Sequence, residues 1–298
     1  MRQSIINLFQ QVIVFKYTLP HDNIGKSEYT SVNRVDYCYS SSCNEQLAEI
    51  IYNSIIDYAF NETEITNNID ELLIEALVTR LRIEENDSDQ TQEKYGFFGE
   101  VLLNLFLHIF FSTTTIIAKG YFYDILKPEE PKGYDSYHLI ETSNDLELWF
   151  GEVKFHQKYT SALNSVFKNI EKAISDNYFK KNLLALLPHK NNLNVHQTSI
   201  NSIIQFLKSN PNTTIESLVN KFNLKLIYPI FIICNSKTNY ETTISSIITE
   251  IKSKHSGKSL NIGISYELFF LLMPIDDVKS IKQKVLQWIK SQKQLTLL

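Results

Sequence analysis

The sequence has very few cysteines. Its 298 residues include only Cys38, Cys43 and Cys234, and no second Cys or His pair stands at the spacing of a zinc site. So low a count excludes a disulfide-stabilised scaffold and favours a reducing compartment. Residues 1–17 contain no small-residue cleavage site, so we expect no secretory signal peptide and a cytoplasmic location.

The chain also lacks an excess of positive charge and a long hydrophobic run. Lys and Arg number 29 against 33 Asp and Glu, a formal net charge of −4. This balance excludes a free-standing, strongly basic nucleic-acid binder, so any polymer would need a local patch or a partner. The most apolar stretch, Phe97–Phe111, is interrupted by Gly99, Glu100, Asn104 and His108. It is too short and too polar to span a membrane.

Several common catalytic motifs are missing as well. The sequence has no Gly-rich phosphate loop, no Gly-x-Ser-x-Gly elbow and no evident Cys/His nucleophile pair. These absences exclude the usual kinase, ATPase and serine-hydrolase classes.

What is present predicts an α/β fold. Residues 1–40 are expected to form short strands, and the apolar spacing predicts helices over 44–60 and 69–85. The polar segment 84–93 is interpreted as a surface connection and a domain boundary. Beyond it we expect a buried helix (94–111), strands (113–126, 134–142, 146–155), a helix capped by Thr160 (160–179), a helical insertion (about 183–222), and then strand, helix, strand and helix (225–235, 242–254, 261–275, 276–292). The predicted organisation is an N-terminal α+β lobe over 1–93 and a domain over 94–298 with a mixed sheet flanked by helices.

Three charged residues stand in the strands predicted over 134–142 and 146–155, or directly beside them. Asp135, Glu152 and Lys154 lie in segments otherwise suited to burial, where a charge is costly unless it is paired or binds a metal. Because side chains alternate along a strand, Glu152 and Lys154 share one face. If the loop is centred between Ser143 and Asn144, paired positions sum to 287 and Asp135 lies opposite Glu152, with Cβ atoms about 5 Å apart.

This register depends on loop length. A loop of two or four residues gives it, whereas a three-residue loop would place Asp135 opposite Val153. Two facing carboxylates beside a lysine are unfavourable as bare neighbours, but they suit a divalent cation that also holds waters and substrate phosphates. A third carboxylate, Glu100, falls with Asn104 and His108 on one polar stripe of the buried helix. We expect that stripe to face Asp135 and Glu152.

The order of these residues resembles the PD-(D/E)xK nuclease core. The segments GFFGEVLL, GYDSYH and WFGEVKF resemble one branch more closely, the DUF1837 or HamA family, which supplies the nuclease subunit of the Hachiman anti-phage defence system. The abortive-infection protein AbpA resembles the same branch. The likeness covers about residues 30–290, with its specific motifs within 95–156. One departure is that Tyr134, and not Pro, precedes the Asp.

The resemblance implies a restriction-endonuclease-like fold and a Mg²⁺- or Mn²⁺-dependent DNA nuclease, held by a superfamily 2 helicase partner such as HamB. It implies that Asp135, Glu152 and Glu100 are metal ligands and that Lys154 is the catalytic lysine. Cleavage would leave a 5′-phosphate and a 3′-hydroxyl. The helicase would be a separate chain, since no helicase motif occurs here. The alternative is a nuclease-like but inactive regulatory or scaffold subunit of such a complex, which the intact Asp135, Glu152 and Lys154 disfavour.

Simpler interpretations apply to the other polar residues. The Glu-x-Lys pattern occurs three times, at Glu130/Lys132, Glu152/Lys154 and Glu250/Lys252. The first and last are expected to lie on solvated surface. His108 is interpreted as a core histidine, and alternation places His138 on the face opposite Asp135. The lysines of the helix that follows the hairpin are interpreted as a solvated face: Lys168, Lys172, Lys180 and Lys181.

Overall fold

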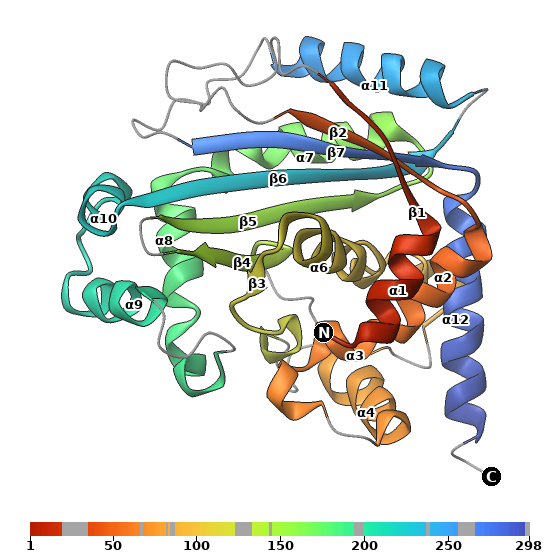
Figure 1. The fold of residues 1–298 in the computed structure, drawn as a ribbon, viewed down its shortest axis with the longest axis horizontal. Helices are drawn as coiled ribbons and strands as arrows, with labels where there is room; N and C mark the ends of the chain where they lie inside the picture. Colours follow the sequence, from red (N-terminus) through yellow and green to blue (C-terminus); the bar gives the residue numbers. More distant parts are fainter. Residues whose placement is uncertain are drawn as a thin grey trace.

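The strands form one mixed seven-stranded sheet in the order β1-β2-β7-β6-β5-β4-β3 (Figure 1). The structure, a computed structural model, describes residues 1–19, 35–65, 68–81, 83, 87–122, 133–142, 145–193, 199–236, 239–255 and 266–295. The strands are β1 (Ile13–Leu19), β2 (Asp36–Ser41), β3 (Thr114–Thr115), β4 (Ser136–Glu141), β5 (Leu146–Phe155), β6 (Leu224–Asn235) and β7 (Tyr266–Ile275). The α/β fold with a mixed sheet is therefore confirmed.

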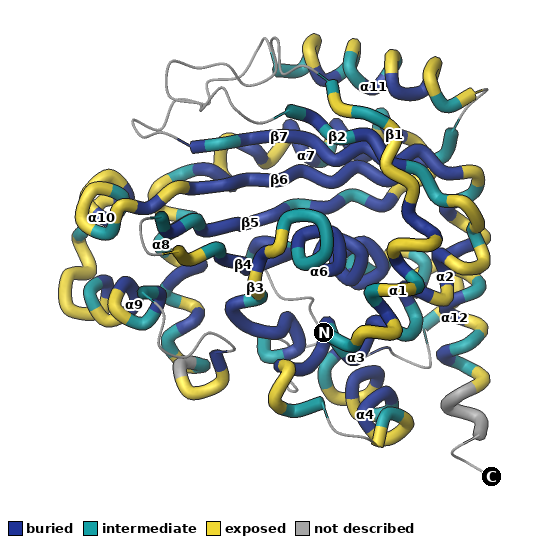
Figure 2. The backbone as a smooth tube through the Cα atoms, in the orientation of Figure 1, coloured by how far each residue is buried: buried dark blue, intermediate teal, exposed yellow. Residues whose placement is uncertain are grey.

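Parallel pairing holds the centre of the sheet. β2, β7, β6 and β5 are mutually parallel neighbours, while β1–β2, β5–β4 and β4–β3 pair antiparallel. The near-continuous apolar runs of β6 and β7 are buried, as expected for parallel strands covered on both faces (Figure 2). Pro229 lies within β6 beside Gly151 of β5, where a Cβ on Gly151 would meet the Pro229 ring at 3.3 Å.

Helices cover both faces of the sheet. One face, here the α7 face, packs against α7 (Tyr159–Ala173), α8 (Asp176–Leu184), α9 (Ser199–Ser209), α10 (Ile215–Phe222) and α11 (Tyr240–His255). The other, the α6 face, packs against α1 (Gln3–Val12), α2 (Asn44–Asn53), α3 (Ile55–Ala59), α4 (Ile69–Glu75), α6 (Phe97–Phe111) and α12 (Val278–Leu295). Short helical segments complete the order: the 3₁₀ helices η1 (Glu62–Glu64), η3 (Lys119–Phe122) and η4 (Leu187–Asn192), the π-helical turn η2 (Ala76–Arg80) and the α-helix α5 (Asp89–Gln92).

The N-terminal segment differs from its predicted strands. Residues 3–12 form the helix α1, because Ile5, Phe9 and Val12 fall at helical spacing and all three are buried. The predicted surface connection over 84–93 contains the short helix α5, which Ser88 caps by accepting the Thr91 N–H, and residues 88–91 are exposed. Residues 84–86 lie outside the described part of the chain.

The strand predicted over 113–126 is mostly wrong. Only β3 pairs with β4, after which the chain turns into η3. Gly120 explains the turn: a Cβ there would lie 2.2 Å from the Ala59 carbonyl oxygen, so the backbone packs directly against the end of α3. Residues 123–126 lie outside the described part of the chain. The predicted cap at Thr160 is also wrong, since α7 begins at Tyr159 without a side-chain cap.

The predicted N-terminal lobe is continuous with the rest of the fold. Its strand β2 pairs with β7, joining Tyr37 to Leu271, so its two strands extend the common sheet. Its buried side chains share one hydrophobic cluster with α6, α12 and β5–β7. The boundary placed at residue 93 therefore marks no break in the sheet or in the core.

One stretch is long and apolar enough to be considered a membrane span. It is Asp89–Phe111, with a mean hydropathy of 1.2 over its most apolar window, and 61% of that window is buried inside the protein. Most of this window therefore packs inside the protein, in agreement with the interrupted sequence of α6.

Candidate active site

The β4–β5 hairpin has the predicted register. Ser136 pairs with Gly151 and Glu141 pairs with Leu146, so paired positions sum to 287. One step beyond Ser136, the Asp135 N–H donates to the Gly151 carbonyl oxygen at 3.0 Å. A regular ladder would pair Asp135 one position further along β5, so the pairing slips here and the regular register ends at Ser136–Gly151. Asp135 nevertheless lies near Glu152, because its charge contributes to the pKa of that carboxyl.

Asp135 is fixed by the backbone of the neighbouring strand. Its Oδ2 accepts a hydrogen bond from the Val153 N–H at 2.8 Å, which holds the carboxylate against β5. The preceding residue, Tyr134, is buried and stacks on Phe150 at 4.9 Å between ring centroids. Its hydroxyl donates to the Ala173 carbonyl oxygen at 2.6 Å, so a packed and hydrogen-bonded tyrosine anchors this position.

Glu152 and Lys154 form a partly buried ion pair. Lys154 Nζ lies 2.5 Å from Glu152 Oε1, and the two side chains are 19% and 18% exposed. Burial and the charge of Asp135 raise the pKa of Glu152 to about 7, against the lowering effect of Lys154. Burial alone would lower the pKa of Lys154, but the charges of Asp135 and Glu152 outweigh it and raise that pKa. Glu152 therefore changes charge near neutral pH while Lys154 stays protonated.

Glu100 reaches the site through a buried lysine. Its carboxylate accepts a hydrogen bond from the Tyr58 hydroxyl and lies 3.6 Å from Lys119 Nζ, which also donates to the Tyr134 carbonyl oxygen. Burial would lower the pKa of Lys119, but the charge of Glu100 leads the contributions that raise it, with Asp135 and Glu152 among them. Lys119 thus links the α6 carboxylate to the acids of the hairpin.

The expected orientation of the polar stripe is wrong for Asn104. Its Oδ1 lies 2.9 Å from His138 Nε2 and accepts the Thr115 hydroxyl at 3.1 Å, on the α6 face of β4. The reason is that the helix α6 covers one face of the sheet, whereas alternation along β5 places Glu152 and Lys154 on the other, the α7 face, with Phe150. His138 lies on the α6 face of β4, where it contacts Asn104.

The donor chemistry of the hairpin fits a hard divalent cation. Mg²⁺ is usually held by one or two carboxylates together with waters and substrate phosphates. Asp135 and Glu152 supply two such carboxylates, and the mutual repulsion that raises the pKa of Glu152 is what a cation would relieve. Among the described residues, no group of three or more His, Cys, Asp or Glu side chains is arranged to hold a metal ion. Glu100, engaged by Tyr58 and Lys119, is therefore not part of a ready-made three-acid cage.

Two of these contact residues were missed from the sequence alone. Lys119 stands as a lone charge in the apolar run TTIIAKGYF, which is the same signal that singled out Lys154. Tyr58 carries no such signal, because only the packing of α3 against α6 brings its hydroxyl to Glu100. Of the other two Glu-x-Lys copies, Glu130/Lys132 lies outside the described residues, and Glu250 pairs with Lys254 on helix α11.

The fold and the hairpin together define the class. A mixed sheet flanked by helices, with Asp135 and Glu152-x-Lys154 on one antiparallel hairpin, has the organisation of the PD-(D/E)xK restriction-endonuclease-like core. The sequence model of the HamA family matches residues 12–289 of the 298, so the chain belongs to the HamA family and is a Hachiman defence-associated protein. No significant match was found among curated proteins or among solved structures.

Proposed function

We propose that this chain is a metal-dependent DNA nuclease that acts as the effector of an anti-phage defence complex. The observation that carries the proposal is the cluster of Asp135, Glu152 and Lys154: Asp135 lies close enough to raise the pKa of Glu152, and Lys154 pairs with Glu152 at 2.5 Å. Family membership supports the defence role. A separate superfamily 2 helicase is the proposed partner, and it would bring DNA to a chain whose net charge is −4.

The residues of the hairpin divide the chemistry between them. Asp135 and Glu152 would hold Mg²⁺ or Mn²⁺, and Asp135 is already oriented for this by the Val153 amide. When bound, the cation supplies a water of lowered pKa and neutralises charge on the phosphate. Lys154 stays protonated, and its ammonium would stabilise the charge that develops on the phosphate. Glu100 and Lys119 position the hairpin acids from the side of α6.

The test is cleavage of supercoiled plasmid by the full chain, with and without its helicase partner, in Mg²⁺ and in EDTA. Glu152→Gln and Lys154→Met keep the size of each side chain but remove its charge, and each should lower the rate about 100-fold or more. Glu250→Gln and Lys252→Met provide the matched control, because they make the same changes in the same tripeptide pattern on the surface of α11.

The outcomes separate the proposal from its rival. Activity lost in EDTA and in both hairpin variants, but kept in both control variants, supports a metal-dependent nuclease. If wild type and hairpin variants behave alike in every condition, partner included, the nuclease proposal is wrong. The regulatory or scaffold subunit would then replace it.

A further inference from the structure

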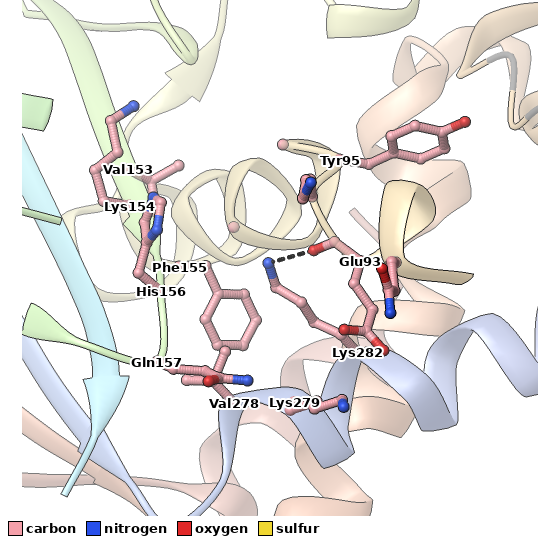
Figure 3. A pocket seen from close by; sticks show the side chains of 14 residues that line it. Glu93, Tyr95, Val153, Lys154, Phe155, His156, Gln157, Val278, Lys279 and Lys282 are labelled. Atoms are coloured by element: carbon pink, nitrogen blue, oxygen red, sulfur yellow. Dashed lines mark hydrogen bonds between the residues drawn. The ribbon is translucent and has the colours of Figure 1, made fainter. Parts of the chain in front are cut away.

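A cleft of about 570 Å³ opens directly beside Lys154 (Figure 3). Its walls come from the turn before α6, the end of β5 and the first turns of α12. Lys154 lies at its edge and directs its amine away from Lys282, toward the ion pair with Glu152. The cleft and the candidate active site therefore share a residue.

The lining of the cleft is strongly basic. It contains four lysines, Lys94, Lys154, Lys279 and Lys282, against the single carboxylate of Glu93. That carboxylate is already engaged, since its Oε1 accepts a hydrogen bond from the Gln283 amide at 2.7 Å. In a chain with a formal net charge of −4, this is a local concentration of positive charge. The lining suits an anion and excludes a free metal cation.

The four lysines have different surroundings. Lys282 is only 8% exposed, lies 5.1 Å from the centre of the Phe155 ring, and donates to the Glu93 carbonyl oxygen at 2.8 Å. It stabilises the floor of the cleft. Lys94 and Lys279 are exposed and come from two different elements, the turn before α6 and the first turn of α12. Two exposed cations in one cleft, with Lys154 at its edge, suit an extended ligand that carries repeated negative charges.

We propose that this cleft, here called the α12 cleft, binds backbone phosphates of the nucleic-acid strand next to the bond that is cut. The proposal rests on the proposed nuclease function and adds the path of the substrate. A strand with its scissile phosphate at Lys154 continues past Lys154, and the cleft is the adjoining basic channel. Lys94 and Lys279 each bind one phosphate, while Lys282 keeps the walls together. An acidic segment of a protein partner is the other class of ligand that this charge would accept.

The test measures binding separately from cleavage. The full chain is titrated against a fluorescein-labelled DNA duplex, a single DNA strand, an RNA of the same sequence and a poly-glutamate peptide, in EDTA and over a range of salt. The cleft variant is Lys94→Gln with Lys279→Gln. The control variant is Lys168→Gln with Lys181→Gln, which removes the same charge from exposed positions of α7 and α8 outside the cleft lining. Lys282 is left intact because its change would disturb the floor.

The expected result is quantitative. Each lysine–phosphate contact contributes about 0.9 to the slope of log affinity against log salt on duplex DNA and about 0.7 on a single strand. The cleft variant should lower that slope by about 1.4 to 1.8 and weaken binding about 10-fold, while the control variant matches wild type. The polymer whose binding shows this loss identifies the substrate as duplex DNA, single-stranded DNA or RNA.

Two outcomes would show that the α12 cleft is not the path of the substrate, while the proposed nuclease function would still hold. In the first, the cleft variant keeps the slope and affinity of wild type and plasmid cleavage persists. In the second, only poly-glutamate binding is lost, which assigns the cleft to an acidic protein segment. A chain that neither binds nor cuts any nucleic acid, with its partner present, overturns the proposed function itself and the path with it.

Discussion

The raised pKa of Glu152 leads to a measurable dependence of stability on pH. The pKa is about 7 in the folded protein against an ordinary value of 4.5, and the difference of about 2.5 units corresponds to about 3 kcal/mol. A carboxyl group with a raised pKa is favoured when protonated, so its contribution to stability is complete below pH 4.5 and is lost as the pH rises through about 7. In metal-free protein, the ionisation of Glu152 therefore lowers the free energy of unfolding over this interval.

Replacing the titrating group removes that loss. Glu152→Gln keeps the size of the side chain but cannot ionise, so its stability relative to wild type should rise by up to about 3 kcal/mol, mostly between about pH 5 and pH 7. Any effect of the amide that does not depend on pH shifts the whole curve without changing its slope. The measurement is urea unfolding in EDTA at a series of pH values, with Glu250→Gln as the matched control, for which the difference from wild type should stay constant.

Adding Mg²⁺ should restore most of the stability that wild type loses when Glu152 ionises. At a pH above 7, a metal concentration of about 100 times its Kd should stabilise wild type by about 2.7 kcal/mol and leave Glu152→Gln nearly unchanged. A stability difference between Glu152→Gln and wild type that is flat across pH would refute the reasoning, because it would mean that Asp135 and burial do not perturb Glu152. A flat difference combined with no Mg²⁺ effect would also remove the carboxylate pair as a metal site.

Two further predictions concern the elements that support the hairpin. His138 is buried, its Nε2 facing Asn104 Oδ1 and its Nδ1 facing the Thr113 hydroxyl, and burial lowers its pKa to about 3. A protein with a neutral buried histidine loses stability as the pH falls below 6.5, so His138→Gln should remove a loss of about 2 kcal/mol at about pH 5. The free energy of unfolding, measured in urea, should then fall less steeply toward acid pH than in wild type. An unchanged slope contradicts this prediction. Gly151→Ala places a Cβ 2.6 Å from Ser136 Oγ and 2.9 Å from Leu103 Cδ2, so it should cost about 1–3 kcal/mol. Adding Ser136→Ala should recover part of that cost, and no recovery would mean that Leu103 alone causes the clash.

The local features of the hairpin were predictable because they depend on neighbours in sequence. Strand alternation and a symmetric loop were enough to predict the pairing of β4 with β5 from Glu141–Leu146 to Ser136–Gly151. The slip at Asp135, just before β4, was not predicted. The burial of α6 followed from its largely apolar composition. The helix α1 was missed although Ile5, Phe9 and Val12 have helical spacing, because the β-prone residues after them belong to β1.

The surroundings of the acids could not be predicted in the same way. The contacts of Glu100 with Tyr58 and Lys119 depend on how α3 and η3 pack against α6. The α12 cleft likewise combines Lys94 and Lys279, which stand far apart in the sequence and meet only because α12 lies beside the start of α6. These contacts arise from tertiary packing, about which the spacing of residues along one element carries no information.

The pairing of β2 with β7 also determines when the molecule can be completed during its synthesis. Tyr37 leaves the ribosome early, but its partner Leu271 follows more than two hundred residues later. The β4–β5 hairpin can form from a short local segment, whereas the wall that α12 supplies to the cleft emerges only after β6, α11 and β7. Such distant pairings fold slowly compared with local ones. A nascent chain therefore carries the hairpin acids before it has the cleft beside them, and the site is assembled only once α12 has been made.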